Sequence, residues 1–257
     1  MEEWQKLVGQ LSKQIRPTTY PVAIKFFEGI DNVPKGMRRP KVRVHGCSLF
    51  SLARRHGSSL VTTVDDIACT AIAIFGFIEF SEDFINWYSD FLAPLYAKTR
   101  EAAEKTVRSF PRIEYGKFSA ITVSPLEKAE IEPDLIMVYM NPAQVVQVLV
   151  GVLKRSEKGM RLEFTFGDPL STCSYGIAKA YNTKEVRIVI PGTGDRESGL
   201  TQDDELAVII PIEKLSYLVS GIEESVKAMG RSYPVRMKVE VPTEINEYQK
   251  GLLRFSK

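Results

Sequence analysis

One continuous stretch, residues 133–155, constrains the fold more than any other part of this chain. It reads PDLIMVYM and then NPAQVVQVLVGVLKR. The first part is apolar throughout, which is typical of a central strand buried on both faces of its sheet. In the second part Asn141 suits a helix N-cap and Pro142 suits the first helical turn. A buried strand followed at once by a largely apolar helix predicts a sheet covered by helices.

Helical and strand patterns alternate along the rest of the chain without the strict period of a barrel. We expect an α/β or α+β fold, with a mixed sheet flanked by helices in a single compact domain that spans residues 1–257. The expected helices are 3–16, 47–55, 67–77, two within 82–109 that break near Pro94, 212–229, and a terminal one ending at Lys257. The expected strands are 20–29, 59–64, 116–126, 161–167, 185–192 and 233–242, while 205–210 fits either type.

Two pairs of short segments resemble each other. YPVAIK at 20–25 is similar to YPVRMK at 233–238, and CSLFSLAR at 47–54 is similar to CSYGIAK at 173–179. A single domain built from two related halves would explain both pairs, and chance similarity between short apolar segments would explain them too.

Composition excludes several classes of protein. The 34 basic and 32 acidic side chains leave a net charge of +2, which is too small to predict a nucleic acid or an anionic membrane as partner. No apolar stretch reaches the ~18 residues that suggest a membrane span, and the acidic start MEEWQKL is not a secretory signal. We therefore expect a cytoplasmic protein whose three cysteines are reduced thiols.

The three cysteines share a local setting. Cys47, Cys69 and Cys173 each fall in or just before the first turn of an expected helix, and each precedes a serine or threonine. Unpaired N–H groups at such a place favour thiolate over thiol and can donate to the sulfur of a bound cluster. The spacing matches no zinc-ribbon or ferredoxin pattern, and free cysteine is commonly a small buried hydrophobe. A joint site and a purely structural role both stay open on the residues alone.

Several motifs together resemble the domain-of-unknown-function 169 family. They are PVAIKF, CSLFSLARRHG, the cysteine of DDIACTAIAIFGF, EPDLIMVYMNPAQ, and STCSYGIAKAY followed by PGTGDR and IIP. This resemblance covers most of the chain and implies a prokaryotic protein, but it carries no settled activity. It also implies that Cys47, Cys69 and Cys173 are the family's characteristic cysteines.

If the three thiolates converge, they suggest a cubane [4Fe–4S] iron–sulfur cluster with one iron that lacks a cysteine ligand. That iron would bind a small molecule or a sulfur-containing ligand, as a Lewis acid or an electron relay. Three thiolates and an open position would also suit zinc, and His45 could complete such a set, although a structural role is the better interpretation of an isolated histidine. The alternative is a metal-free small-anion binding or regulatory module with structural cysteines. A homo-oligomer stays open.

Charged residues near these motifs supply further expectations. In GTGDRESG, interpreted as a loop, Asp195 and Arg196 are candidate pocket residues, since arginine can clamp a carboxylate or phosphate. The five basic residues within 35–43 would favour an anionic centre if their loop folds over it. Asp65 and Asp66 are expected to cap the helix that carries Cys69. The aromatic face at 84–95 is interpreted as core packing.

Overall fold

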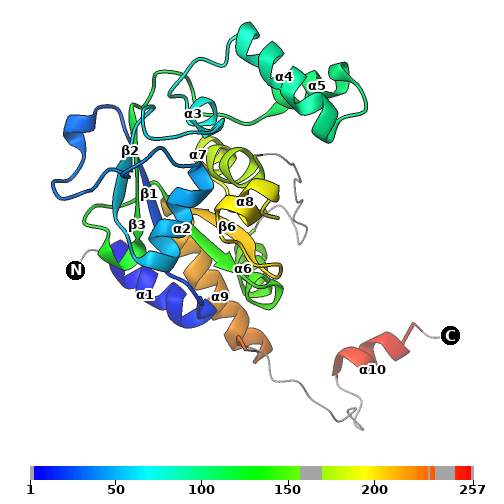
Figure 1. The fold of residues 1–257 in the computed structure, drawn as a ribbon. Coiled ribbons are helices and arrows are strands. Elements are labelled where there is room, and N and C mark those ends of the chain that lie inside the picture. The colour runs from blue at the N-terminus through cyan, green and yellow to red at the C-terminus, as the bar shows by residue number, and fades with distance from the viewer. Residues whose placement is uncertain (1–2, 157–169, 231, 235–246, 256–257) are drawn as a thin grey trace.

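A computed structural model describes residues 3–156, 170–230, 232–234 and 247–255 (Figure 1). These residues form a six-stranded sheet in the order β2-β3-β1-β4-β6-β5. Every pair of named strands is antiparallel, so the fold is α+β, and the sheet, expected to be mixed, is antiparallel throughout its named strands. The strands are β1 (Val22–Phe27), β2 (Leu60–Thr62), β3 (Ala120–Pro125), β4 (Leu135–Met140), β5 (Arg187–Val189) and β6 (Leu206–Pro211).

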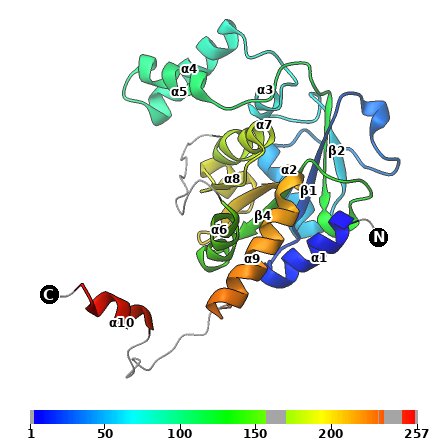
Figure 2. The ribbon, with the colours of Figure 1, turned by 180° about the vertical axis from the view of Figure 1, so that it is seen from behind.

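Helices cover both faces of the sheet, and each face has its own hydrophobic core. One face carries α1 (Glu3–Ile15), α6 (Pro142–Arg155) and α9 (Leu215–Met229), which lie in front of the strands in Figure 2. The other face carries α2 (Gly46–His56), α3 (Ala71–Ile74), the π-helix η3 (Ser171–Ala178), α7 (Lys179–Thr183) and α8 (Thr193–Ser198). The hairpin of α4 (Glu82–Tyr96) and α5 (Arg100–Ser109) projects away from the sheet, and α10 (Glu247–Leu253) follows near the C-terminus. None of the helices in the described ranges is long and apolar enough to cross a membrane.

The central strand and its helix form as the sequence predicts. All residues of β4 are buried, and Asn141 caps α6 by accepting the N–H of Gln144. The Gln144 side chain in turn accepts the N–H of Asn141, which completes a capping box. Its amide group donates to the carbonyls of Ile15 and Arg16, so the start of α6 also fixes the end of α1.

The sheet consists of two halves with the same topology. In each half the first strand lies at the centre of the sheet, the third strand beside it and the second at the edge: β1, β3, β2 and then β4, β6, β5. The register repeats as well, with matching end pairs: Val22–Pro125 and Phe27–Ala120 in the first half, Leu135–Pro211 and Met140–Leu206 in the second. The third strand of each half ends in a similar sequence, PLEK at 125–128 and PIEK at 211–214, and each forms a 3₁₀ turn. This repetition of order, register and sequence favours a duplicated half-domain over chance similarity.

Of the two pairs of similar segments that suggested duplication, the structure describes both members of only one. CSLFSLAR starts α2, between the first and second strands of the first half, and CSYGIAK lies in η3 and α7, between the first and second strands of the second half. They therefore occupy equivalent places. The segment YPVRMK and the strands expected at 161–167 and 233–242 lie mostly or wholly outside the described residues.

Other local expectations need correction. GTGDRESG is a short helix, α8, in place of a loop, and the helix expected at 67–77 shrinks to α3. The break expected near Pro94 is confirmed, since α4 ends at Tyr96 and α5 begins at Arg100. The aromatic face at 84–95 is only partly core: Tyr88 is buried, whereas the side chains of Trp87, Phe91 and Leu95 are more than half exposed.

Candidate functional site

A two-residue parallel bridge aligns the segments that carry Cys47 and Cys69. The N–H of Val44 donates to the carbonyl of Asp66, and the N–H of Ala68 donates to the carbonyl of Val44. Cys47 and Cys69 lie a few residues after the bridge in their own segments. As a result the N–H of Gly46, at the start of α2, donates to Sγ of Cys69 over 3.3 Å.

The sulfur atoms of Cys69 and Cys173 meet at Gly46. A Cβ atom added to Gly46 would lie 3.3 Å from Sγ of Cys173, 4.0 Å from Sγ of Cys69 and 3.0 Å from Cβ of Ala71. Two thiols that are far apart in the sequence thus lie around one point, and the missing side chain of Gly46 leaves the space they share.

Cys47 completes the group from the first turn of α2. Its thiol donates to the carbonyl of Gly194 over 3.3 Å, and its Cβ would lie 3.1 Å from a Cβ placed on Gly199. The three thiols interact electrostatically: Cys69 raises the pKa of Cys47, and both raise the pKa of Cys173. Cys47 and Cys69 are half-buried and Cys173 is buried, so the group reaches from the interior toward the surface.

The first turn of η3 fixes the position of Cys173. Ser171 accepts the N–H of Gly192, Thr172 donates to Asp195, and Ser174 donates to the carbonyl of Pro111. The hydroxyl groups on both sides of Cys173 therefore tie the turn to α8 and to the segment before β3. π-Helices are rare in proteins, and those that do occur are often found at functional sites.

Burial dominates the acidity of all three thiols. It raises the pKa of Cys47 to about 12, raises that of Cys69, and raises that of Cys173 well above its ordinary value. Backbone N–H groups at the helix starts lower the pKa of Cys47 and Cys69, as the sequence predicts, but their effect is the smaller one. Because burial outweighs these hydrogen bonds and the pKa of each cysteine is raised, the expected thiolates are neutral thiols.

The structure separates the two candidate pocket residues of α8. Asp195 is buried, accepts hydrogen bonds from the hydroxyl groups of Tyr139 and Thr172, and raises the pKa of all three cysteines. Arg196 points elsewhere: its guanidinium donates to the carbonyl of Gln202 and lies 3.6 Å from a carboxylate oxygen of Asp203. The carboxylate faces the thiols, and the guanidinium does not contact them.

A buried ion pair supports this side of the site. The guanidinium of Arg54 donates to both carboxylate oxygens of Glu205, over 2.8 and 3.1 Å, and lies 3.8 Å above the ring of Tyr139. Burial acts to raise the pKa of Glu205, but the hydrogen bonds from Arg54 and the N–H of Gln202 lower it overall. Sequence reasoning missed these residues. Helical spacing supplied a signal, because Arg54 lies seven positions after Cys47 and so falls on the same face of α2.

Other candidates lie at the margin of the thiol group. His45 is exposed, and its Nδ1 lies 3.0 Å from the hydroxyl of Ser198. Asp66 does not cap α3: its carboxylate accepts from Arg39 and from the N–H of Thr63, and α3 has Thr70 at its N-cap. Within the basic run 35–43, Arg39 and Arg43 bind the turn at 63–66 that precedes Cys69.

The four groups come in equal numbers from the two halves. Cys47 and Cys173 each lie in the first turn of a helix, α2 or η3, between the central strand and the edge strand of its half; in the second half α6 comes before η3. Cys69 and Asp195 each lie a short distance after the edge strand of its half, β2 or β5. The site therefore lies where the two halves meet on one face of the sheet, with three thiols and one carboxylate in four related positions.

Three thiols form a soft set of donors. Among the described residues no group of three or more His, Cys, Asp or Glu side chains has the geometry to hold a single metal ion. A cubane cluster sets a different requirement, because each cysteine sulfur binds a different iron atom and the sulfurs stay further apart. Cys47, Cys69 and Cys173 are the residues that could hold such a group.

Comparisons with known proteins agree with the resemblance found in the sequence. The family profile described as DUF169, uncharacterised ArCR, matches residues 10–221. The uncharacterised protein MJ0308 of Methanocaldococcus jannaschii is 26% identical over 209 residues, which is 79% of this chain and 86% of that relative. No solved structure matches the chain. The profile covers both halves of the sheet and all three cysteines, and the chain therefore belongs to the DUF169 family of uncharacterised ArCR proteins.

Proposed function

We propose that this protein binds a [4Fe–4S] cluster through Cys47, Cys69 and Cys173. A single observation carries the proposal: the sulfurs of Cys69 and Cys173 lie around Gly46, and the thiol of Cys47, the next residue, interacts electrostatically with both. When bound, such a cluster supplies a Lewis-acidic iron or an electron relay.

The electrostatics of the thiol site favours the binding of positively charged iron. Three neighbouring thiols whose pKa values are raised by burial and by one another are poor nucleophiles, and they lie beside the buried carboxylate of Asp195. Iron favours the deprotonated sulfur and offsets the mutual repulsion of the thiolates, so binding would release their protons. The N–H groups that point at Cys47 and Cys69 would then stabilise the thiolate sulfurs.

Asp195 suits the corner of the cluster that lacks a cysteine. It lies in the second half where Cys69 lies in the first, and the hydroxyl groups of Tyr139 and Thr172 hold its carboxylate in place. A carboxylate is a harder ligand than a thiolate, so this corner would exchange its ligand most readily. A small sulfur-containing molecule or a carboxylate could bind there. The proposal includes a reducing compartment such as the cytoplasm, where the thiols stay free.

Metal analysis of the whole chain tests the proposal. After anaerobic reconstitution with iron and sulfide, we expect four irons and four sulfides per chain and the visible absorption of iron–sulfur charge transfer. Replacing Cys47, Cys69 or Cys173 with alanine should remove most of the iron, and the three variants should behave alike. Arg196→Ala is the matched control, because Arg196 lies on α8 next to Asp195 without contacting the thiols, and it should keep its cluster.

Two outcomes would contradict this function. If the wild-type protein retains no iron and sulfide after reconstitution, the cysteines are packing residues, as in the metal-free alternative. Iron loss in only one of the three alanine variants would mean a single reactive thiol in place of a shared site.

A further inference from the structure

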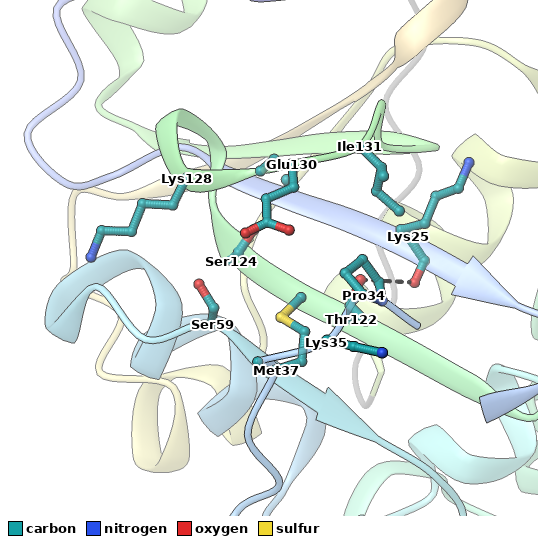
Figure 3. A pocket seen from close by; sticks show the side chains of 13 residues that line it. Lys25, Pro34, Lys35, Met37, Ser59, Thr122, Ser124, Lys128, Glu130 and Ile131 are labelled. Carbon is teal, nitrogen blue, oxygen red and sulfur yellow. Dashed lines mark hydrogen bonds between the residues drawn. The ribbon is translucent and has the colours of Figure 1, made fainter. Parts of the chain in front are cut away.

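A cavity lies on the opposite face of the sheet from the thiols. It has a volume of about 280 Å³, which suits a small molecule. Its floor is formed by β1 and β3, and its walls by the turns around Gly36 and Lys128 (Figure 3). Figure 3 shows Ser59, Ser124 and Glu130 in the middle of the cavity, with Lys25 and Lys128 on opposite sides.

The duplicated half-domain shows that this floor is unusual. Each floor residue has an equivalent in the second half at the same register, where the strands are covered by α6 and α9. The equivalents of Ala23, Lys25, Thr122 and Ser124 are Ile136, Val138, Val208 and Ile210, and all four of these are fully buried core residues. The first half therefore has small and polar side chains where its own repeat has large apolar ones.

A missing helix explains why the cavity exists. After the 3₁₀ turn at the end of β6 the chain enters α9, which packs over the sheet. After the equivalent turn at the end of β3 (Leu126–Lys128) it passes directly to β4 without a helix. The space that a helix fills in the second half is left open in the first.

The polar groups of the cavity are partly without partners. Ser124 is only 4% exposed, yet its hydroxyl has no hydrogen-bond partner among the described residues. This hydroxyl lines the cavity, where a polar ligand atom can form a hydrogen bond with it. Ser59 likewise lacks a side-chain partner within the described ranges.

The charge around the cavity is positive. Lys25 is neutralised by Asp134 at 2.9 Å, but Lys128 donates only to the carbonyl of Gly57, and Lys35 has no partner in the described part of the chain. Glu130 is the acidic residue among those lining the cavity. Two lysines without a carboxylate partner against one glutamate leave one positive charge for a ligand to balance.

We propose that this cavity binds a small organic carboxylate with a short apolar body. Lys35 and Lys128 attract the carboxylate, the hydroxyls of Ser59 and Ser124 bind it, and Met37 and Ile131 contact the apolar part. Phosphate fits less well, because the cavity has a single unbalanced positive charge, a glutamate, and no arginine to form a bidentate contact. This site is separate from the thiols and does not depend on the function proposed for them.

Thermal shift and titration calorimetry on the full chain test the proposal with acetate, butyrate, hexanoate and inorganic phosphate at constant ionic strength. Butyrate or hexanoate should raise the Tm in a saturable way, and phosphate should not. Ser124→Ile, which installs the residue that the second half has at this position, should abolish the shift by filling the cavity.

Two further variants guard against a folding defect. Lys35→Met, at the exposed rim, should weaken carboxylate binding at least tenfold, whereas Lys98→Met, at an exposed lysine away from the cavity, should leave it unchanged. Absence of any carboxylate-dependent shift in the wild type, equal binding by wild type and both cavity variants, or tighter binding of phosphate would each overturn the assignment. None of these readouts requires iron, so the two proposals fail or hold separately.

Discussion

Gly46 is the residue on which the thiol site depends most directly. Gly46→Ala would place a Cβ 3.0 Å from that of Ala71 and 3.3 Å from Sγ of Cys173, in the space between the sulfurs of Cys69 and Cys173. We expect most of the bound iron to be lost and the fold to be destabilised by about 1–3 kcal/mol through overpacking. Iron content and denaturant unfolding measure the two effects. Gly9→Ala is the control: no atom lies within 4 Å of its added Cβ, and in helix α1 it should stabilise by about 0.5–1 kcal/mol.

The raised thiol pKa values predict how the metal-free protein responds to pH. Folding raises the pKa of Cys47 from 9.0 to about 12, so the folded state keeps a proton that the unfolded chain releases. The folded state is therefore favoured below pH 9, and this contribution is lost progressively as the pH rises toward about 12. Urea unfolding at a series of pH values should show this decline, and Cys47→Ser should make it shallower. Stability that rises with pH over this range would contradict the assignment of Cys47 as a half-buried, neutral thiol.

A buried ion pair is one of the links between helix α2 and the second half of the sheet. Arg54 is 1% exposed and binds both carboxylate oxygens of Glu205, so Arg54→Ala removes the main partner of a buried carboxylate and leaves it only the N–H of Gln202 and the more distant Arg55 among the described residues. We expect a loss of about 3–5 kcal/mol in the free energy of unfolding. The neighbouring Arg55 is partly exposed, and Arg55→Ala should cost less than about 1 kcal/mol. Equal effects from the two substitutions would show that the ion pair does not fix α2.

Sequence patterns predicted elements well where local chemistry decides the structure. Asn141 and Pro142 defined the start of α6, and the apolar run before them defined β4, because capping and burial are encoded within a few residues. The sequence patterns gave the wrong prediction for α8 and for Asp66. GTGDRESG becomes helical where the carboxylate of Asp195 binds Tyr139 and Thr172, and Asp66 turns toward Arg39. Both outcomes depend on partners that are distant in sequence.

At the scale of the whole molecule the duplicated half-domain accounts for both candidate sites. Three thiols and Asp195 lie where the halves meet on one face, and the cavity lies on the other face where the first half lacks a helix. The sequence offered only short echoes of this duplication, because the halves share a pairing register more than they share residues. Because the halves share so few residues, the correspondence between Cys47 and Cys173, and between Cys69 and Asp195, became visible only with the strand order.

Anomalous diffraction at the iron edge, from crystals of the anaerobically reconstituted protein, tests the central claim most directly. The account predicts an iron peak between the sulfur atoms of Cys47, Cys69 and Cys173, with the carboxylate of Asp195 at the corner that has no cysteine. Reconstituted crystals in which the three sulfurs surround no iron, or in which iron binds elsewhere on the chain, would contradict it.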